Sequence, residues 1–307
     1  NHWGDIVKGS YVSLMNKMIE EGKEVEFINL CETKHNAMLA ELGNQIKANI
    51  DSIRLIAIAG PSSSGKTTFT NRVRIELMAR GITPLMISID DYYKGRHEAP
   101  LDADGKPDLE HLEALDIDLF NDHMKKLISG EEVELPEFDF IEGKRKSEYK
   151  NIKLNSKDVI IVEGLHALNP VITDSLPQDR LLKIYINLST RIYDKKGNIV
   201  LNKRNMRFIR RLVRDFKFRG SSVEKTYKLW ITVRYGEDTY LFPFKDNADI
   251  KINTIHLYET CILKEMAIEL LSMLDKESAF YNESQRLVRA LQKFPVLDSS
   301  LVPEDSL

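Results

Sequence analysis

The segment of residues 53–80, IRLIAIAGPSSSGKTTFTNRVRIELMAR, constrains this chain more than any other. Its first part, Ile53 to Ala59, is a short apolar run with β-branched residues that predicts a buried strand. Its last part, Thr67 to Arg80, has apolar residues at helical spacing and predicts a helix that ends near Gly81. Between them, GPSSSGKT fits the phosphate-binding loop (P-loop) motif G-x-x-x-x-G-K-[ST], in the strand–loop–helix setting that the motif requires.

The residue types in this loop suit a polyphosphate ligand. Glycines at positions 60 and 65 let the backbone turn tightly and approach phosphates, while loop amides and the helix N-terminus point at the anion. We expect Lys66 to reach the β- and γ-phosphates and the Thr67 hydroxyl to bind Mg²⁺. A chance glycine- and serine-rich turn is the alternative, which is disfavoured because every fixed position is filled. The loop residues predicted to bind a nucleoside triphosphate, taken as ATP, are Gly60, Pro61, Ser62, Ser63, Ser64, Gly65, Lys66, Thr67 and Thr68.

The composition excludes several other classes of protein. The chain has 307 residues, of which 42% are hydrophobic and 30% charged, and a net charge of −3. These values argue against a disordered chain and against a general nucleic-acid or membrane-surface binder. The sequence has no apolar stretch of about 18 residues and no signal-peptide core, so we expect no membrane association. Cys31 and Cys261 lie far apart, which predicts reduced thiols and a cytoplasmic location.

Two further apolar runs end in acidic residues. Residues 84–89, PLMISI, precede Asp90 and Asp91, and residues 158–162, DVIIV, precede Glu163. Ligands of parallel α/β sheets bind outside the carboxyl ends of the strands. We therefore expect one of the two aspartates to accept the proton of an attacking hydroxyl and the other to help hold the metal, with Glu163 organising Mg²⁺. The plainer alternatives are a polar turn with helix-capping aspartates and an incidental acid at a strand end.

The segment between these acids changes its pattern twice. A long polar loop at residues 95–116 is expected to contain a helix start at about Asp108. An amphipathic helix is predicted over Leu115 to Ile128, closed by Gly130. Alternating residues over 131–154 then predict a β-hairpin or flap. We interpret the basic run 144–146 (Lys-Arg-Lys) as its solvated tip, with phosphate contact as the alternative.

A basic helix is predicted over residues 204–219, RNMRFIRRLVRDFKFR. Arg207, Arg210, Arg211 and Arg214 recur at helical spacing, so they share one face. Such a face can close over phosphates and stabilise charge in a transition state, and we favour this function, a helical lid. A solvated basic face and a nucleic-acid footprint are the alternatives, and the acidic net charge disfavours nucleic acid.

Four elements in fixed order resemble the uridine kinase and phosphoribulokinase family of P-loop kinases: GPSSSGKT, SIDDYYK, LPEFDF with VEG, and RRLVRDFKFRG. The resemblance covers about residues 53–275. It is closest to a bacterial subgroup in which a uridine-kinase-like domain follows a region similar to the N-terminal part of threonyl-tRNA synthetase. It implies an ATP- and Mg²⁺-dependent kinase that phosphorylates a hydroxyl of a small molecule, with a nucleoside 5′-hydroxyl favoured. A homo-oligomer is possible.

The resemblance also implies roles for single residues. Asp90 matches the general base, Tyr93 an aromatic of the nucleoside pocket, and Glu110 a carboxylate that binds ribose hydroxyls. Arg211, Arg214 and Arg219 match lid arginines that contact the triphosphate and the transferred group. The candidates beyond the loop are therefore catalytic Asp90, Lys66, Arg211 and Arg214; ATP-binding Arg219; acceptor-binding Asp90, Tyr93, Glu110 and Phe138; and metal-binding Thr67, Asp90 and Glu163.

The resemblance fails where the family reads the pyrimidine base. The Tyr and His of the family's hairpin are Phe138 and Gly143 here, and two polar lid residues are Ser221 and Leu229. A site that lacks its hydrogen-bonding groups loses discrimination, so the acceptor stays open. The alternatives are a sugar phosphate or pantothenate-like acceptor, and a nucleotide-binding regulatory protein or RNA-linked ATPase without nucleoside kinase activity.

The expected fold is an α/β P-loop kinase: a mostly parallel sheet flanked by helices, with the β-hairpin flap and the helical lid. Residues 51–275 form the predicted kinase domain. Residues 1–50 form a helical extension or a connection to a missing upstream domain, since the chain lacks a starting Met. His35 in this region is expected at the surface. Residues 276–307 form a C-terminal helix and a polar tail that we expect to fray.

Overall fold

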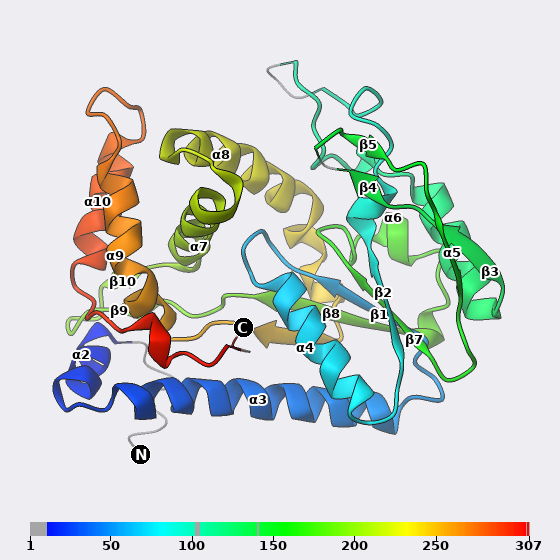
Figure 1. Cartoon of the computed structure of the whole chain (residues 1–307), viewed down its shortest axis with the longest axis horizontal. Helices are drawn as coiled ribbons and strands as arrows, with labels where there is room; N and C mark the ends of the chain where they lie inside the picture. The colour runs from blue at the N-terminus through cyan, green and yellow to red at the C-terminus, as the bar shows by residue number, and fades with distance from the viewer. Residues whose placement is uncertain (1–10, 102–104, 140, 305, 307) are drawn as a thin grey trace.

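The computed structural model describes residues 11–101, 105–139, 141–304 and 306. Its centre is a five-stranded sheet in the order β11-β8-β1-β7-β2, and each pair of neighbouring strands is parallel (Figure 1). This confirms the predicted parallel sheet. The strands are β1 (Leu55–Ala59), β2 (Pro84–Ser88), β7 (Val159–Glu163), β8 (Leu181–Asn187) and β11 (Ile250–Asn253).

Helices cover both faces of the sheet, which explains why β1 is apolar throughout. All five residues of β1 are buried, as expected of a parallel strand covered on both sides. Ile56 and Ile58 pack toward the helices α3 and α4, while Leu55 and Ala57 pack toward the α5 side. The covering helices are α3 (Glu24–Ala48), α4 (Lys66–Met78), α5 (Ile117–Ser129) and α6 (Pro170–Thr173).

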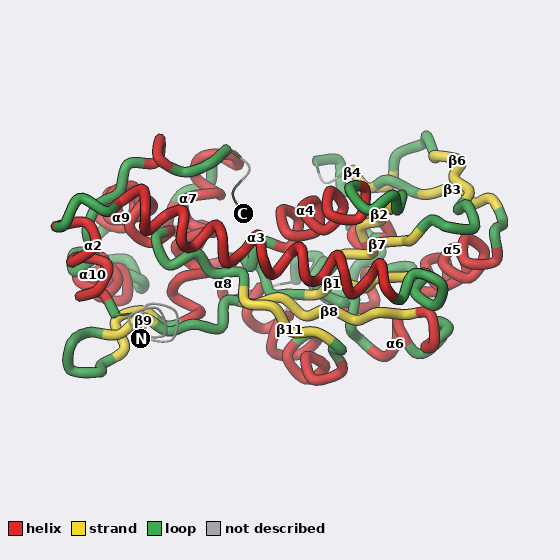
Figure 2. Tube along the Cα trace, turned by 90° about the horizontal axis from the view of Figure 1, so that it is seen from below, coloured by secondary structure: helices red, strands yellow, loops and turns green. Residues whose placement is uncertain are grey.

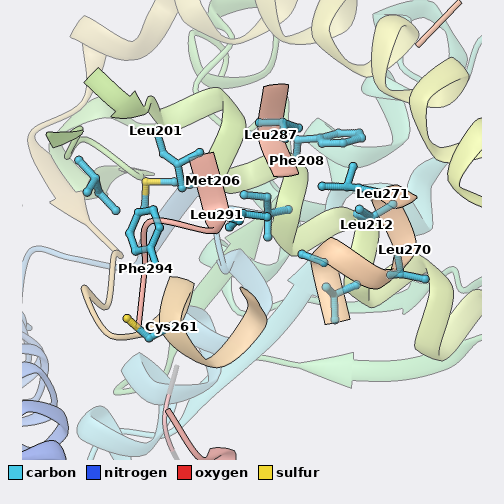
Figure 3. Close-up of a cluster of buried hydrophobic side chains, with 14 of the residues drawn as sticks. Leu201, Met206, Phe208, Leu212, Cys261, Leu270, Leu271, Leu287, Leu291 and Phe294 are labelled. Carbon is cyan, nitrogen blue, oxygen red and sulfur yellow. The ribbon is translucent and has the colours of Figure 1, made fainter. Parts of the chain in front are cut away.

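A second group of helices lies beside one end of the sheet and shares its own apolar core (Figure 2). Figure 3 shows how apolar side chains of this core meet, among them Phe208, Leu212, Leu271 and Leu291. This packing fixes one face of α7 and leaves its basic face free to reach the P-loop. The group, here called the helical body, consists of α2 (Val12–Glu20), α7 (Lys203–Arg219), α8 (Val223–Tyr240), α9 (Glu259–Ser272) and α10 (Tyr281–Leu291).

The predicted hairpin is confirmed at the opposite end of the sheet (Figure 1). Its outer strands β3 (Glu132–Leu135) and β6 (Lys150–Lys153) pair antiparallel, and so do its inner strands β4 (Phe138–Asp139) and β5 (Lys144–Arg145). The remaining elements are β9 (Ile192–Tyr193), β10 (Ile199–Leu201) and the 3₁₀ turns η1 (Ile89–Tyr92), η2 (Leu112–Ala114), η3 (Gln178–Arg180), η4 (Phe242–Asn247) and η5 (Ser299–Leu301).

Three sequence predictions about local structure are wrong. No helix begins near Asp108, where the chain forms η2, although the helix predicted over 115–128 is confirmed as α5, which Asp116 caps and Gly130 ends. His35 is not at the surface: it is 5% exposed, and its ring centroid lies 4.2 Å from that of His256. The tail is not free directly after Phe294, because Leu297 is buried in the core of the helical body.

Neither Cys31 nor Cys261 forms a disulfide. Within the described residues, none of the helices has both the length and the apolar character needed to cross a bilayer.

Candidate active site

The P-loop connects the end of β1 to the first turn of α4. Gly65 adopts the left-handed conformation (φ 85°) directly before α4, where a side chain would be strained. A Cβ on Gly60 would lie 2.6 Å from the carbonyl oxygen of Ile186, so this position also requires glycine. Lys66 crosses the loop and donates from Nζ to the carbonyl oxygen of Gly60 at 2.8 Å. Thr67 and Thr68 lie in the first turn of α4, where free amides favour an anion.

The acidic residues meet beside this loop, as the strand pattern predicts. Asp90 lies in η1, directly after β2, and Glu163 is the last residue of β7. In the sheet, Glu163 is paired with Ser88 of β2 on one side and Ile58 of β1 on the other. Burial, and then the negative charge of Glu163, raise the pKa of Asp90 to about 6, although Lys66 counteracts them.

Asp91, the second acid of the pair, contacts the hairpin. Its carboxylate accepts a hydrogen bond from the backbone N–H of Phe138 at 3.1 Å and so anchors the hairpin. A part of Asp91 in metal binding therefore stays a prediction. The charge of Lys66 acts on Asp90, whereas Asp91 bonds the hairpin backbone, and the DD pattern alone does not reveal this difference.

The predicted acceptor residues surround Asp90. Tyr93 and Phe138 are buried, and their rings meet edge to face with centroids 5.5 Å apart. Burial, and then the charge of Asp90, raises the pKa of Glu110 to about 7. Burial, and then the charges of Asp90 and Glu110, also raises the pKa of Tyr93. Gly143 has a φ of 68°, and a Cβ there would lie 2.4 Å from Cδ of Arg96. The structure thus brings Asp90, Tyr93, Glu110 and Phe138 together.

The basic face of α7 contacts the P-loop directly. Arg211 donates from Nη1 to the Ser62 hydroxyl at 2.9 Å, and Arg210 donates from Nη1 to the carbonyl oxygen of Ser63 at 3.3 Å. Arg210 is further held by an ion pair with Glu259. Arg210 and Arg211 therefore face the P-loop and not the solvent, while their action on bound phosphates stays a prediction.

Comparison with known proteins identifies the family. The model of the Phosphoribulokinase / Uridine kinase family matches residues 55–260. The chain belongs to this family. Uridine kinases of Staphylococcus aureus strains JH9 and Newman are 34% identical over 200 residues, which cover 64% of this chain and 86% of theirs. A solved kinase of Silicibacter sp. TM1040, named for a fructose transport system, shares the fold with a TM-score of 0.50 and 19% identity, over 70% of this chain and 98% of its own.

Membership of this kinase family makes the chain an ATP-dependent phosphotransferase that acts on an alcohol, as the resemblance implies. Family members use ATP with a divalent metal. Among the described residues, no three His, Cys, Asp or Glu side chains form a metal site by themselves. The Thr67 hydroxyl and the carboxylates of Asp90 and Glu163 fit the pattern of a P-loop kinase, in which phosphates, water, a hydroxyl and one or two carboxylates hold the metal. The buried hydroxyls of Ser63 and Ser64 lack hydrogen-bond partners in the described structure, which also fits a loop built around phosphates.

One functional position of this kinase escaped the sequence analysis. Asp215 is 1% exposed and forms ion pairs with Arg211 (3.1 Å), Arg214 (2.8 Å) and Arg219 (3.5 Å). In the described structure, Arg214 and Arg219 reach Asp215 and not the P-loop, so their contact with phosphate stays a prediction. The sequence does contain a signal for this cluster: Asp215 is the single acid inside the basic helix, and it lies four residues from both Arg211 and Arg219.

Arg145 corrects the interpretation of the hairpin tip. Its guanidinium donates to the carbonyl oxygens of Tyr92 (3.0 Å) and Tyr93 (2.9 Å), and it forms an ion pair with Asp116 at 3.1 Å. Arg145 therefore ties the hairpin to the segment after Asp90. Only its neighbours Lys144 and Lys146 are exposed, each paired with a nearby glutamate.

Proposed function

We propose that this kinase transfers the γ-phosphoryl group of ATP, with Mg²⁺, to a primary hydroxyl of an uncharged small molecule, with a nucleoside 5′-hydroxyl as the first candidate. Asp90 carries this proposal. It is a carboxylate with a raised pKa beside the P-loop lysine, between the phosphates' expected position and the acceptor residues. A general base works best when its pKa lies near the working pH. The name of the uridine kinase relatives supports a nucleoside.

Each site residue has its own role in this proposed reaction. Asp90 accepts the proton of the attacking hydroxyl, while Tyr93 and Glu110 orient the acceptor. Lys66 and Arg211 offset the negative charge that develops on the phosphate oxygens. Thr67 and Glu163 would hold Mg²⁺, whose charge, when bound, also offsets that of the phosphates.

The acceptor pocket offers little to read a pyrimidine as the family does. Phe138 has no polar side-chain atom, and Gly143 is covered by the stem of Arg96. An acceptor base would therefore be recognised mainly by the aromatic pair Tyr93 and Phe138. An anionic acceptor such as a sugar phosphate is disfavoured, because the Arg145 guanidinium is already engaged.

ADP release with a panel of nucleosides, polyols and sugar phosphates tests the proposal. Acceleration by an uncharged acceptor, with its phosphorylated product detected by mass spectrometry, is the expected result. Tight ATP binding with no accelerating acceptor would instead favour a regulatory or RNA-linked function. In that case tRNA should stimulate ATP hydrolysis.

Charge reversal at the hairpin tip separates neutral from anionic acceptors. Lys144→Glu and Lys146→Glu should each change the KM of the acceptor by less than about twofold, because exposed ion pairs contribute little and the acceptor carries no charge. Steady-state kinetics with each substrate varied checks this. A large rise in acceptor KM with an unchanged KM for ATP would mean that the acceptor is anionic.

The pH profile should show the raised pKa of Asp90. At low concentrations of both substrates, kcat/KM should fall as the pH falls through about 6, because the base becomes protonated. Glu163→Gln should move this limb to lower pH, since it removes the negative charge that raises the pKa. Asp122→Asn, at an exposed pair on α5, is the matched control and should leave the limb in place. A limb near pH 4 in the wild type would contradict the role of Asp90.

For residues 1–50 we also propose a connection to an upstream region similar to the N-terminal part of threonyl-tRNA synthetase. The coding sequence immediately upstream of this chain tests it. An unrelated coding sequence there would contradict it.

A further inference from the structure

Ser62, the third residue of the P-loop, is held by the helical body through all of its polar groups. Its N–H donates to Oε1 of Glu237 in α8 at 2.7 Å. Its carbonyl oxygen accepts a hydrogen bond from Nη1 of Arg207 in α7 at 3.0 Å, and its hydroxyl oxygen accepts one from Arg211 at 2.9 Å. The position of the loop therefore depends on α7 and α8 as well as on β1 and α4.

Glu237 and Arg207 form a buried, two-pronged ion pair. The two hydrogen bonds measure 2.7 and 2.9 Å, and both side chains are about 1% exposed. The guanidinium carbon of Arg207 lies 5.2 Å from the ring centroid of Trp230. Stability alone does not explain a buried ion pair, since apolar residues of similar volume often give equal stability. The directional hydrogen bonds from both partners to Ser62 indicate that the pair positions the P-loop.

The neighbouring residue of α8 contacts the acceptor pocket. Gly236 lies within α8, where glycine costs about 1 kcal/mol relative to alanine. A Cβ at this position would lie 3.0 Å from Cβ of Glu110. Glycine thus permits a close approach between α8 and the acceptor carboxylate. Consecutive residues of one helix therefore contact the two halves of the site.

We infer that Arg207 and Glu237 are positioning residues that hold the P-loop in its ATP-binding shape, and that residues 236–237 of α8 set the spacing between this loop and Glu110. The loop half of this inference rests on ATP binding at the P-loop. The Glu110 half rests on the proposed acceptor site. Neither Arg207 nor Glu237 needs to touch the reacting atoms.

Glu237→Asp separates positioning from stability. Aspartate keeps the charge that compensates Arg207 but is one methylene shorter, so it cannot serve both Arg207 and the Ser62 N–H. The Kd of a non-hydrolysable Mg-ATP analogue, measured well below the Tm of the variant, should rise about tenfold, because the Ser62 N–H loses its partner and the loop is no longer held in its binding shape. Asp238→Asn is the matched control, because its partner Arg204 is exposed, and it should leave the Kd unchanged.

Direct binding distinguishes the failure of this inference from that of the proposed function. A wild-type protein that does not bind the analogue would refute ATP binding itself. Tight wild-type binding with an equal Kd for Glu237→Asp would overturn the positioning role. If Glu237→Asp unfolds, the double variant Arg207→Met with Glu237→Met replaces it. Its Kd for the analogue is measured at a temperature where circular dichroism shows it folded. A Kd equal to that of the wild type overturns the inference.

Gly236→Ala tests the acceptor half. The added methyl group should push Glu110 away and raise the KM of the acceptor about tenfold, while the Kd of the ATP analogue stays the same. Thr239→Ala, at an exposed position of the same helix, is the control. An unchanged acceptor KM, or an equal loss of both affinities, would overturn the spacing role of α8.

Discussion

Asp90→Asn is expected to lower kcat by about 10²- to 10⁴-fold, the usual contribution of a general base. The same substitution should stabilise the folded protein at pH 7. Burial and Glu163 disfavour the charged form of Asp90 in the folded state, and asparagine carries no charge. A pKa raised from about 4 to about 6 corresponds to roughly 2–3 kcal/mol in the free energy of unfolding. Loss of activity together with gain of stability would mark a group placed for chemistry and not for the fold.

The pH dependence of this gain is a further check. Between about pH 4 and 6 the folded wild type binds more protons at Asp90 than the unfolded chain, so its stability falls as the pH rises through this window. The wild type and Asp90→Asn should therefore be closest in stability below about pH 4 and differ fully above about pH 6. Urea unfolding at several pH values measures this. A variant that keeps more than about a tenth of the wild-type kcat would contradict the general-base role.

Asp215→Asn is expected to cost about 3–5 kcal/mol in the free energy of unfolding, because it leaves the buried Arg211 without its compensating charge. Arg214 and Arg219 lose their common partner in the same step. We therefore also expect kcat to fall more than tenfold, since Arg211 can no longer be held toward the P-loop. Urea unfolding and steady-state kinetics on the same preparation check both effects.

Glu283→Gln provides the matched control for Asp215. Glu283 pairs with Arg286 on α10, also through a carboxylate and a guanidinium, but both side chains are largely exposed. This variant should change the free energy of unfolding by less than about 1 kcal/mol and leave kcat unchanged. Equal, small effects of Asp215→Asn and Glu283→Gln would show that Asp215 does not organise the arginines.

The sequence predicted the sheet well because its signals are local. The apolar runs of β1, β2, β7 and β8 stand out, since strands covered on both faces need no polar alternation. The P-loop motif likewise depends on neighbouring residues alone. By contrast, α8 was not predicted, since its apolar positions are interrupted by polar residues and by Gly236, and its boundaries depend on packing in the helical body.

The wrong predictions concern residues whose environment comes from distant segments. His35 stands in a polar stretch, yet His256 and its surroundings bury it. Arg145 stands in a basic run, yet carbonyl groups after Asp90 bind it. Local polarity indicates exposure only when no other element packs on the residue.

By itself the sequence determined the P-loop, the parallel sheet and the acids at the ends of β2 and β7, because backbone conformation and strand pattern are encoded over a few neighbouring residues. Only the tertiary structure decided that Asp91 binds the hairpin backbone and which residues hold Ser62. Ser62 and Glu237 are 175 positions apart, and their contact exists because the apolar core of the helical body places α7 and α8 against the loop. Pairings of this kind depend on how whole helices pack, which no local pattern records.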